Sequence, residues 1–371
     1  MYTWKRTMPE ASWIDEERGV GELAQRLPAH ERIALDTEFL RERTFFARLC
    51  VLQIAAGEGI WCVDAIATPL APLVPVLGSS TTTKLLHAAR QDLEVLYLSS
   101  RCVVAPVFDT QVAAACAGFK PQIGYADLVD TLLGVKLEKA HTRADWSKRP
   151  LSREQLAYAA DDVRYLEPVA RALEDRLREL DREHWVREDC AALTDARRFE
   201  PDPDTAWERL RGIAQLAPRA RARAKLIAAW RERLARERDL PRSWILPDAA
   251  VFEIAHATPQ TAADLSALRA MPPNFNARFA EDLLDTLRDQ APREPPAPEP
   301  EPDGRPTDAQ KAAAERMIRA VDARAAELGV SAEILATRGQ IKALAMGSRQ
   351  IDALAGWRRE VIGERLLALL D

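Results

Sequence analysis

The stretch Ile-Ala-Leu-Asp-Thr-Glu-Phe-Leu, residues 33–40, has apolar residues at both ends and two acids near its middle. The apolar run predicts a buried strand of an α/β sheet. Asp36 and Glu38 are two positions apart, and side chains alternate between the faces of a strand, so both carboxylates should point to the same side. Two carboxylates on one buried face repel each other and lose hydration, so a hard divalent cation between them would stabilise both. Alternatively, both acids lie at the solvent end of the strand and pair with the arginines that follow in the sequence.

The totals indicate a soluble globular protein of two or three domains. The chain has 371 residues, of which 47% are hydrophobic and 29% are charged. Its net charge of −5 does not exclude a nucleic-acid partner, because local charge decides binding. The five cysteines form no CxxC pair and have no zinc-type spacing, which predicts buried thiols in a reducing compartment. The N-terminus has no apolar signal-peptide core, and no run of about 20 apolar residues is present, so we expect a cytoplasmic protein without a membrane partner.

Strand and helix patterns alternate up to about residue 200. Strands are expected at 12–14, 33–39, 49–55, 60–63 and 83–87, and helices at 16–27, 70–77, 88–98, 108–119 and 151–177. The strands at 49–55 and 60–63 should be antiparallel neighbours, because only a short glycine-containing turn separates them. The alternation predicts a mixed, mainly three-layer α/β domain over residues 1–200.

The composition changes after residue 200. Residues 205–290 show helical periodicity and no convincing strand, and residues 307–371 are again helical, with helices expected at 309–328, 331–345 and 351–370. Between them, residues 291–306 contain seven prolines in sixteen positions, with acids in between. That composition predicts a solvated, semi-extended linker between two small all-helical domains.

Two further segments of the first domain carry acids that could reach the same face. Asp92 falls in the first turns of a helix that follows a strand, although an acid there is also favoured by the helix dipole alone. Tyr158 and Asp162 are four residues apart, so they share one face of a helix, and the alanines at 159 and 160 would let that face approach the sheet. The alternative for this pair is a tyrosine–aspartate hydrogen bond on an exposed helix.

The order Asp-x-Glu on a strand, Asp at a helix start, then Tyr-x-x-x-Asp on a helix resembles the tyrosine-bearing (DEDDy) branch of the DEDD exonucleases, and within it the ribonuclease D family. The matching segments are Asp-Thr-Glu-Phe at 36–39, Arg-Thr-Phe-Phe at 43–46, His-Ala-Ala-Arg-Gln-Asp-Leu-Glu at 87–94, Thr-Arg-Ala-Asp-Trp-Ser-Lys-Arg-Pro-Leu at 142–151 and Tyr-Ala-Ala-Asp-Asp-Val at 158–163. Each motif alone is weak, but their common order and spacing are specific. That family also carries helical HRDC modules after its nuclease domain, and this chain has two segments of that type.

The resemblance implies a ribonuclease H-like exonuclease domain over residues 1–200, a first HRDC domain over 205–290 and a second HRDC-like domain over 307–371. It implies metal-dependent 3′→5′ removal of nucleotides from RNA as 5′-monophosphates, with trimming of tRNA precursors that carry 3′ extensions. Two divalent ions, Mg²⁺ with Mn²⁺ able to substitute, would be the only cofactors. The residues that hold or serve these ions would be Asp36, Glu38, Asp92 and Asp162, with Tyr158 orienting the attacking water.

Two sets of residues are candidates for holding the RNA. An exonuclease must hold a frayed terminal base, for which aromatic side chains are suited, although an aromatic residue more often belongs to the core. A local excess of positive charge, eleven Arg/Lys against four Asp/Glu between residues 205 and 242, could grip phosphates or simply be a solvated helix face. The candidates are Phe39, Phe45, Phe46 and Trp146 for stacking, and Arg219, Arg221, Arg223 and Lys225 for phosphates.

Two competing functions remain open from the sequence. The same exonuclease fold could cut DNA, although the helical segments that follow it argue against a proofreading domain. A catalytically inactive RNA-binding scaffold is a second possibility, against which the complete set of four acids argues.

Overall fold

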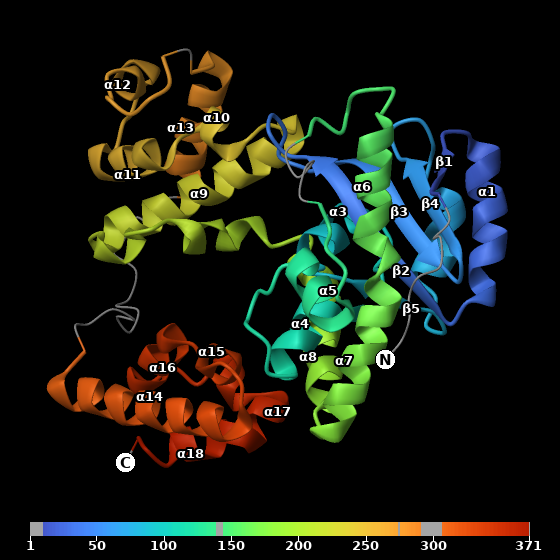
Figure 1. The fold of residues 1–371 in the computed structure, drawn as a ribbon. Coiled ribbons are helices and arrows are strands. Elements are labelled where there is room, and N and C mark those ends of the chain that lie inside the picture. The colour runs from blue at the N-terminus through green and yellow to red at the C-terminus, as the bar shows by residue number, and fades with distance from the viewer. Residues whose placement is uncertain (1–9, 139–143, 274, 291–305, 371) are drawn as a thin grey trace. The chain divides into compact units, whose positions relative to one another are not determined.

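The computed structural model describes residues 10–138, 144–273, 275–290 and 306–370, which divide into two compact units (Figure 1). As far as they are described, the first unit contains Met1–Leu40, Arg48–Phe199 and Pro306–Asp371, and the second contains Arg41–Ala47 and Glu200–Arg305. The proline-rich linker expected at 291–306 lies outside the described residues except for its last position. None of the helices in the described ranges has the length and apolar character needed to cross a membrane.

A six-stranded mixed sheet forms the centre of the first unit, in the order β1-β4-β3-β2-β5-β6 (Figure 1). Its strands are β1 (Ser12–Ile14), β2 (Arg32–Leu40), β3 (Arg48–Ala56), β4 (Gly59–Asp64), β5 (Thr83–Leu86) and β6 (Val107–Asp109). The pairs β2/β3 and β3/β4 are antiparallel and the remaining pairs are parallel. The five expected strands and the antiparallel neighbours are therefore confirmed.

One strand departs from the expectation. The sequence pattern placed residues 108–110 at the start of a helix, whereas Val107–Asp109 forms the edge strand β6 and the helix begins only at Thr110. Three residues are too few to show a strand period, and pairing with β5 decides their conformation.

Helices cover both faces of this sheet and make the predicted three layers. They are α1 (Glu17–Arg26), α2 (Val74–Leu77), α3 (Arg90–Ser100), α4 (Thr110–Cys116), α5 (Tyr125–Leu133), α6 (Arg153–Arg164), α7 (Leu166–Glu179) and α8 (Glu183–Leu193). Helix α6 packs against β2, β3 and β4, and α3 packs against β2 and β3 (Figure 1). The single long helix expected at 151–177 is wrong, because Tyr165 separates α6 from α7 and Pro168 lies in the first turn of α7, where no intrahelical N–H donor is needed.

Within the second unit, the described residues of 205–290 form helices and turns and no strand, as expected. Its elements are three 3₁₀ turns or short helices, η4 (Pro203–Arg209), η5 (Ile213–Gln215) and α10 (Arg242–Ile245), and the helices α9 (Pro218–Arg238), α11 (Asp248–Ala257), α12 (Ala262–Ser266) and α13 (Ala277–Gln290). A core that includes Ile227, Val251 and Leu283 joins α9, α11 and α13. Buried Glu232 on α9 accepts hydrogen bonds from Arg209, Arg236 and Arg242, so its charge is offset within the unit.

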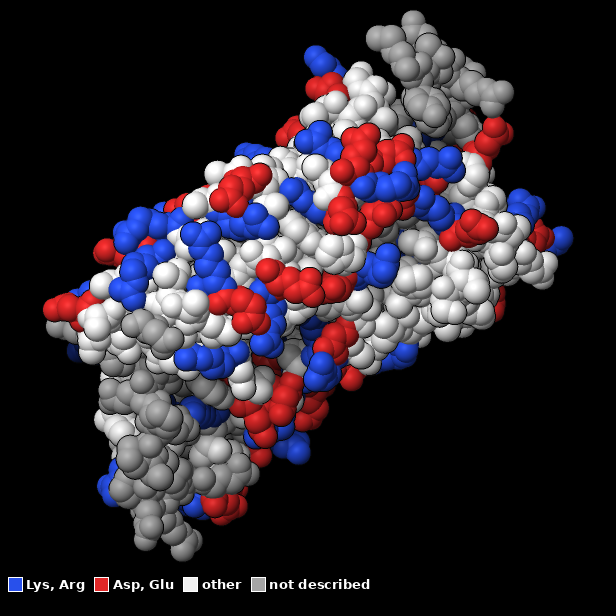
Figure 2. Space-filling view, turned by 90° about the horizontal axis from the view of Figure 1, so that it is seen from below, with Lys and Arg blue, Asp and Glu red and all other residues white. Residues whose placement is uncertain are grey.

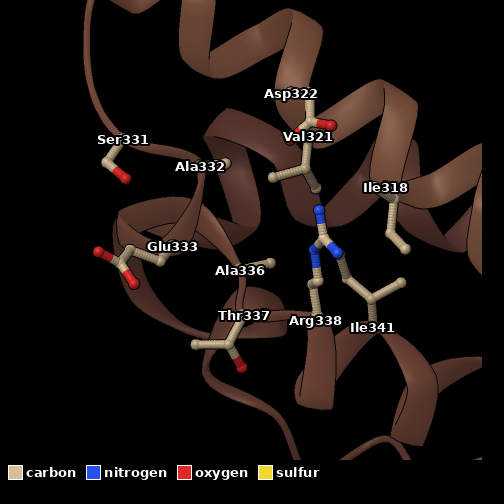
Figure 3. Close-up of a pocket in the computed structure, with 10 residues that line it drawn as sticks. All are labelled: Ile318, Val321, Asp322, Ser331, Ala332, Glu333, Ala336, Thr337, Arg338 and Ile341. Carbon is tan, nitrogen blue, oxygen red and sulfur yellow. The ribbon is translucent and has the colours of Figure 1, made fainter.

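The C-terminal residues form α14 (Asp308–Leu328), α15 (Ala332–Leu335), α16 (Arg338–Ala345), α17 (Gly356–Arg358) and α18 (Glu364–Leu367). The expected turns at Gly329 and Gly347 are confirmed, with φ of 63° and 103°. The helix expected at 331–345 is instead interrupted at Thr337, which caps α16. A cavity of about 380 Å³ opens between α14 and α16, and Arg338 projects into it (Figure 3).

These C-terminal helices share a hydrophobic core with α4, α5, α7 and α8. The rings of Trp185 and Trp357 stack with centroids 3.9 Å apart. Beside them, Arg358 forms an ion pair of 2.6 Å with Asp189. Residues 306–370 therefore belong to the first unit.

Candidate active site

Strand β2 presents two acids to one face of the sheet. Asp36 lies opposite Gln53 of β3 and Glu38 lies opposite Val51, so the two carboxylates follow the expected period of two. A shift of the register between Glu38 and Phe39 ends this regular pairing. Both side chains are partly buried at that end of the strand.

Helix α6 brings a third acid onto the same face. A capping box formed by Ser152 and Gln155 starts the helix. Ala159 and Ala160 are fully buried, so nothing larger than a methyl group separates the helix from the sheet at this point. Asp162 faces the strand and is hydrogen-bonded to the Tyr158 hydroxyl.

The neighbouring acid on α6 has a different partner. Asp161 accepts a 2.7 Å hydrogen bond from Arg164, one turn further along the helix. The four-residue spacing from Tyr158 thus selects Asp162 over the adjacent Asp161.

Asp92 enters from α3, in the first turn of that helix. The Thr37 hydroxyl donates a 2.5 Å hydrogen bond to its Oδ1. The turn before α3 is held by Asp109, whose carboxylate accepts the amides of Ala88 and Ala89 at 3.0 and 2.8 Å. Ala88 takes a φ of 57°, so these bonds fix a left-handed residue at the turn that leads to Asp92.

The three acids on the sheet face form a cluster suited to a metal ion. Asp36, Glu38 and Asp162 each offer a carboxylate oxygen, and these oxygens lie within 4.8 Å of one another. An oxygen-only donor set of this kind is the one that Mg²⁺ and Mn²⁺ prefer. Of the carboxylates predicted as ligands, Asp92 stands outside this trio but is near enough to raise the pKa of both Asp36 and Glu38.

The carboxyl groups at the site hold protons more tightly than free ones. Burial raises the pKa of Asp36 well above its usual value, and the charges of Asp92 and Asp162 raise it further. Burial, followed by the charges of Asp162 and Asp92, raises the pKa of Glu38 to about 8. Burial and then Asp161 raise the pKa of Asp162 to about 7. Burial raises the pKa of Asp92 to about 6, although the Thr37 hydrogen bond opposes it.

These shifts decide between the two interpretations of the paired acids. The charges that act on Glu38 and Asp36 are mainly those of other carboxylates, and they all disfavour ionisation. Pairing with arginines would lower these pKa values instead. The cluster is therefore an arrangement that a divalent cation would stabilise.

Tyr158 remains a phenol at neutral pH. Burial, followed by the charges of Asp162 and Glu38, raises the pKa of its hydroxyl above the ordinary value of a tyrosine. The group is consequently suited to donating and accepting hydrogen bonds, and unsuited to acting as a full base.

Sequence reasoning missed the role of Arg149, whose partner is Asp64 at the end of β4. Arg149 donates to both carboxylate oxygens of Asp64, at 2.6 and 2.7 Å, and to the backbone oxygen of Cys50 at 3.0 Å. These bonds anchor the segment that carries Trp146 to the sheet. The Trp-Ser-Lys-Arg-Pro motif marked the segment, but its partner lies 85 residues away and no local signal reveals it.

The four aromatic candidates lie in different environments. Phe39 and Phe46 are partly exposed. Trp146 is 2% exposed and packs with Tyr158, its ring centroid 6.1 Å from that of the tyrosine. Phe45 is 9% exposed and belongs to the core of the second unit, with the Arg242 guanidinium over its ring. Trp146 and Phe45 thus pack within the protein in this structure, and contact of either ring with a base stays a prediction.

The four basic candidates lie on α9, and three of them have partners within the second unit. Arg221 donates to the backbone oxygen of Ala214 and Arg223 to that of Ala255. Lys225 lies over the Trp207 ring, its Nζ 4.2 Å from the centroid. Arg219 is exposed. Figure 2 shows basic and acidic side chains interspersed over the face that it presents.

The comparisons with known proteins agree with this geometry. A family model described as 3′-5′ exonuclease matches residues 11–178, and one described as HRDC domain matches residues 220–287. Ribonuclease D of Acidiphilium cryptum is 37% identical over 374 residues, covering 98% of this chain and 94% of that protein. Ribonuclease D of Pseudomonas paraeruginosa is 34% identical, covering 98% of this chain and 99% of that protein.

A solved structure extends the similarity to the whole fold. The crystal structure of Escherichia coli RNase D, described as an exoribonuclease involved in structured RNA processing, matches with a TM-score of 0.88 at 30% identity. The match covers 98% of this chain and 99% of that one, including the C-terminal helices beyond the HRDC match. With the exonuclease domain, the acid cluster and the helical HRDC domain all in place, this chain belongs to the ribonuclease D family of metal-dependent 3′-5′ exoribonucleases.

Proposed function

We propose that this exoribonuclease uses two divalent ions, Mg²⁺ with Mn²⁺ able to substitute, to trim the 3′ ends of tRNA precursors and other structured RNAs. The observation that carries the proposal is that carboxylate oxygens of Asp36, Glu38 and Asp162 lie within 4.8 Å of one another. The hydroxyl of Tyr158 is hydrogen-bonded to Asp162. The ribonuclease D relatives support the RNA substrate, and the similarity to Escherichia coli RNase D, an exoribonuclease involved in structured RNA processing, supports structured RNA.

The chain's own residues have distinct parts in this reaction. Bound divalent ions would supply the activated water and stabilise the charge that develops on the scissile phosphate. Asp36, Glu38 and Asp162 would hold such ions, and Asp92 would complete the set from α3, fixed by Thr37. The Tyr158 hydroxyl, kept protonated by its surroundings, would orient the attacking water by hydrogen bonding.

We propose that the exposed candidate residues contact the RNA substrate. Phe39 and Phe46 are partly exposed, so their rings can contact a terminal base. Arg219 is exposed, whereas the other three basic candidates on α9 are partly buried. Arg221, Arg223 and Lys225 would contribute charge near the RNA while keeping their contacts within the helical domain. Salt-sensitive RNA binding would follow from this arrangement.

We also propose how the chain divides into domains and that the protein works in the cytoplasm. We assign residues 1–200 to the exonuclease domain, 205–290 to the first HRDC domain, 291–306 to a linker and 307–371 to a second HRDC-like domain. All five cysteines are free, and four of them are buried, which suits a protein that works in the reducing cytoplasm.

The test uses the purified full chain and three matched substrates. These are a tRNA precursor with a 3′ extension, an unstructured RNA with the same 3′ sequence and a DNA of that sequence, each with Mg²⁺, Mn²⁺ or EDTA. We expect stepwise shortening from the 3′ end with release of 5′-monophosphates, with RNA preferred, and no cleavage in EDTA. Asp36→Ala should abolish cleavage.

Other outcomes would assign the chain differently. Equal or faster shortening of DNA would favour a DNA exonuclease. RNA binding without cleavage under every metal condition would favour the non-catalytic scaffold. Full activity in EDTA would contradict the role given to the acids.

A further inference from the structure

Gln53 lies at the centre of the sheet with no solvent exposure at all. It sits on β3, opposite Asp36 of β2 on one side and opposite Cys62 of β4 on the other. Side chains of directly opposed residues in antiparallel strands share a face, so the Gln53 carboxamide and the Asp36 carboxylate lie on the same side of the sheet. Helix α6 packs over these strands and closes that face.

Both polar atoms of the Gln53 side chain, Nε2 and Oε1, are buried and have no hydrogen-bond partner. Among the described residues with such atoms, the arginines at 221 and 231 make hydrogen bonds through other nitrogens of the same guanidinium group. Gln53 has no such alternative. A buried amide without a hydrogen-bond partner destabilises the folded protein, so a glutamine at this position calls for a partner in some state of the protein.

The register of the sheet favours one partner. Across β4 the neighbour is the buried thiol of Cys62, which packs in one cluster with Ala159 of α6 and with Trp146, whose ring N–H also has no hydrogen-bond partner. Three carboxylates lie on this face, those of Asp36, Glu38 and Asp162, and Asp36 is the one directly opposite Gln53 across the two strands.

We propose that Gln53 is a positioning residue whose Nε2 donates a hydrogen bond to the Asp36 carboxylate when the acid cluster holds a divalent ion. Such a donor would fix the orientation of a carboxylate that belongs to the acid cluster. A neutral amide does this without adding charge to a cluster of acids. The inference rests on the proposed metal site and concerns how this chain organises it.

The first experiment separates a positioning role from ordinary packing. Gln53→Met keeps the length of the side chain and removes both polar atoms. In EDTA we expect the melting temperature of this variant to equal or exceed that of the wild type, because an unpartnered amide is gone. With saturating Mg²⁺ we expect a smaller rise in melting temperature than the wild type shows. Calorimetric titration with Mn²⁺ should give binding about tenfold or more weaker.

Cys62→Ala serves as the matched control. Cys62 is equally buried on the same face, on the side of Gln53 away from Asp36. This variant should lower the melting temperature by the same amount with and without Mg²⁺, and leave Mn²⁺ affinity unchanged. The inference is overturned if Gln53→Met binds Mn²⁺ like the wild type, or if Cys62→Ala weakens binding as much.

A second measurement needs no variant. In a crystal structure of the wild type loaded with Mn²⁺, Nε2 of Gln53 should lie within hydrogen-bonding distance of an Asp36 oxygen. A separation beyond about 3.5 Å from both oxygens would overturn the inference. Failure of the wild type to bind Mn²⁺ at all would instead overturn the metal site itself, so the two failures are distinguishable.

Discussion

The hydroxyl of Thr37 donates a 2.5 Å hydrogen bond to Oδ1 of Asp92, although 55 residues separate the two in the chain. Thr37 lies on β2 between Asp36 and Glu38, so its side chain points to the opposite face from theirs. One strand therefore directs two acids to the face covered by α6 and uses the residue between them to hold a third acid on α3.

Thr37→Val should destabilise the protein by about 1–3 kcal/mol, because it leaves the buried Asp92 carboxyl group without its donor. Thr37→Ser keeps a hydroxyl and should lose less. Urea unfolding in EDTA measures both. In an Asp92→Asn background the Thr37→Val penalty should shrink, and a penalty unaffected by that background would show that the hydrogen bond is unimportant.

Asp162→Asn should lower kcat/KM at least about a hundredfold, because it removes one of the three clustered oxygens and several kcal/mol of stabilisation with it. Asp161→Asn is its matched control. Asp161 is the adjacent acid and pairs with Arg164 outside the cluster, so cleavage should stay near the wild-type rate. Equal losses for the two variants would refute the assignment of Asp162.

Tyr158→Phe should reduce kcat by about a hundredfold while Mn²⁺ affinity and KM stay near the wild-type values. The reason is that a phenol kept protonated by its surroundings positions the attacking water and does not bind the ion. Single-turnover cleavage and calorimetric titration separate the two quantities. Normal turnover in this variant would show that Tyr158 has only a structural role.

The metal-free protein should become less stable as pH rises, because the clustered acids then lose their protons. The folded pKa of Glu38 is about 8, that of Asp162 about 7 and that of Asp92 about 6, whereas unfolded carboxyl groups titrate near about 4. Acids with raised pKa contribute stability that is complete below about pH 4 and is lost as pH rises through the folded values. The melting temperature in EDTA should consequently fall between about pH 5 and pH 8.

Saturating Mg²⁺ should flatten this pH profile, because a cation stabilises the ionised cluster. The increase in melting temperature that Mg²⁺ produces should become larger as pH rises. Differential scanning calorimetry at several pH values, with and without EDTA, gives the comparison. A metal-free melting temperature that rises over that interval would contradict the pKa values of the cluster.

Trp357→Ala should release the C-terminal helices from the exonuclease domain, because Trp357 is 2% exposed and stacks on Trp185. We expect a loss of about 3–5 kcal/mol and faster proteolytic removal of residues 306–371. Trp244→Ala is the control, since Trp244 is 57% exposed and its loss should change stability by less than about 0.5 kcal/mol. Unchanged proteolysis of Trp357→Ala would show that other contacts hold these helices.

The local patterns of the chain determined much of this protein. Alternation of side chains put Asp36 and Glu38 on one face, and four-residue spacing selected Asp162 over Asp161, because both rules depend only on the geometry of one strand or one helix. Motif order then indicated the family. Short elements were the weak point, as the three-residue strand β6 and the break at Tyr165 show.

Only the tertiary structure decided which distant groups meet. It paired Thr37 with Asp92, Arg149 with Asp64 and Trp185 with Trp357, and it buried Phe45 and Trp146 where their aromatic character had suggested contact with RNA. It also placed Gln53 beside Asp36 without a partner. Such contacts join residues far apart in the chain, and no local period encodes them, because the packing of whole elements selects the partner of each side chain.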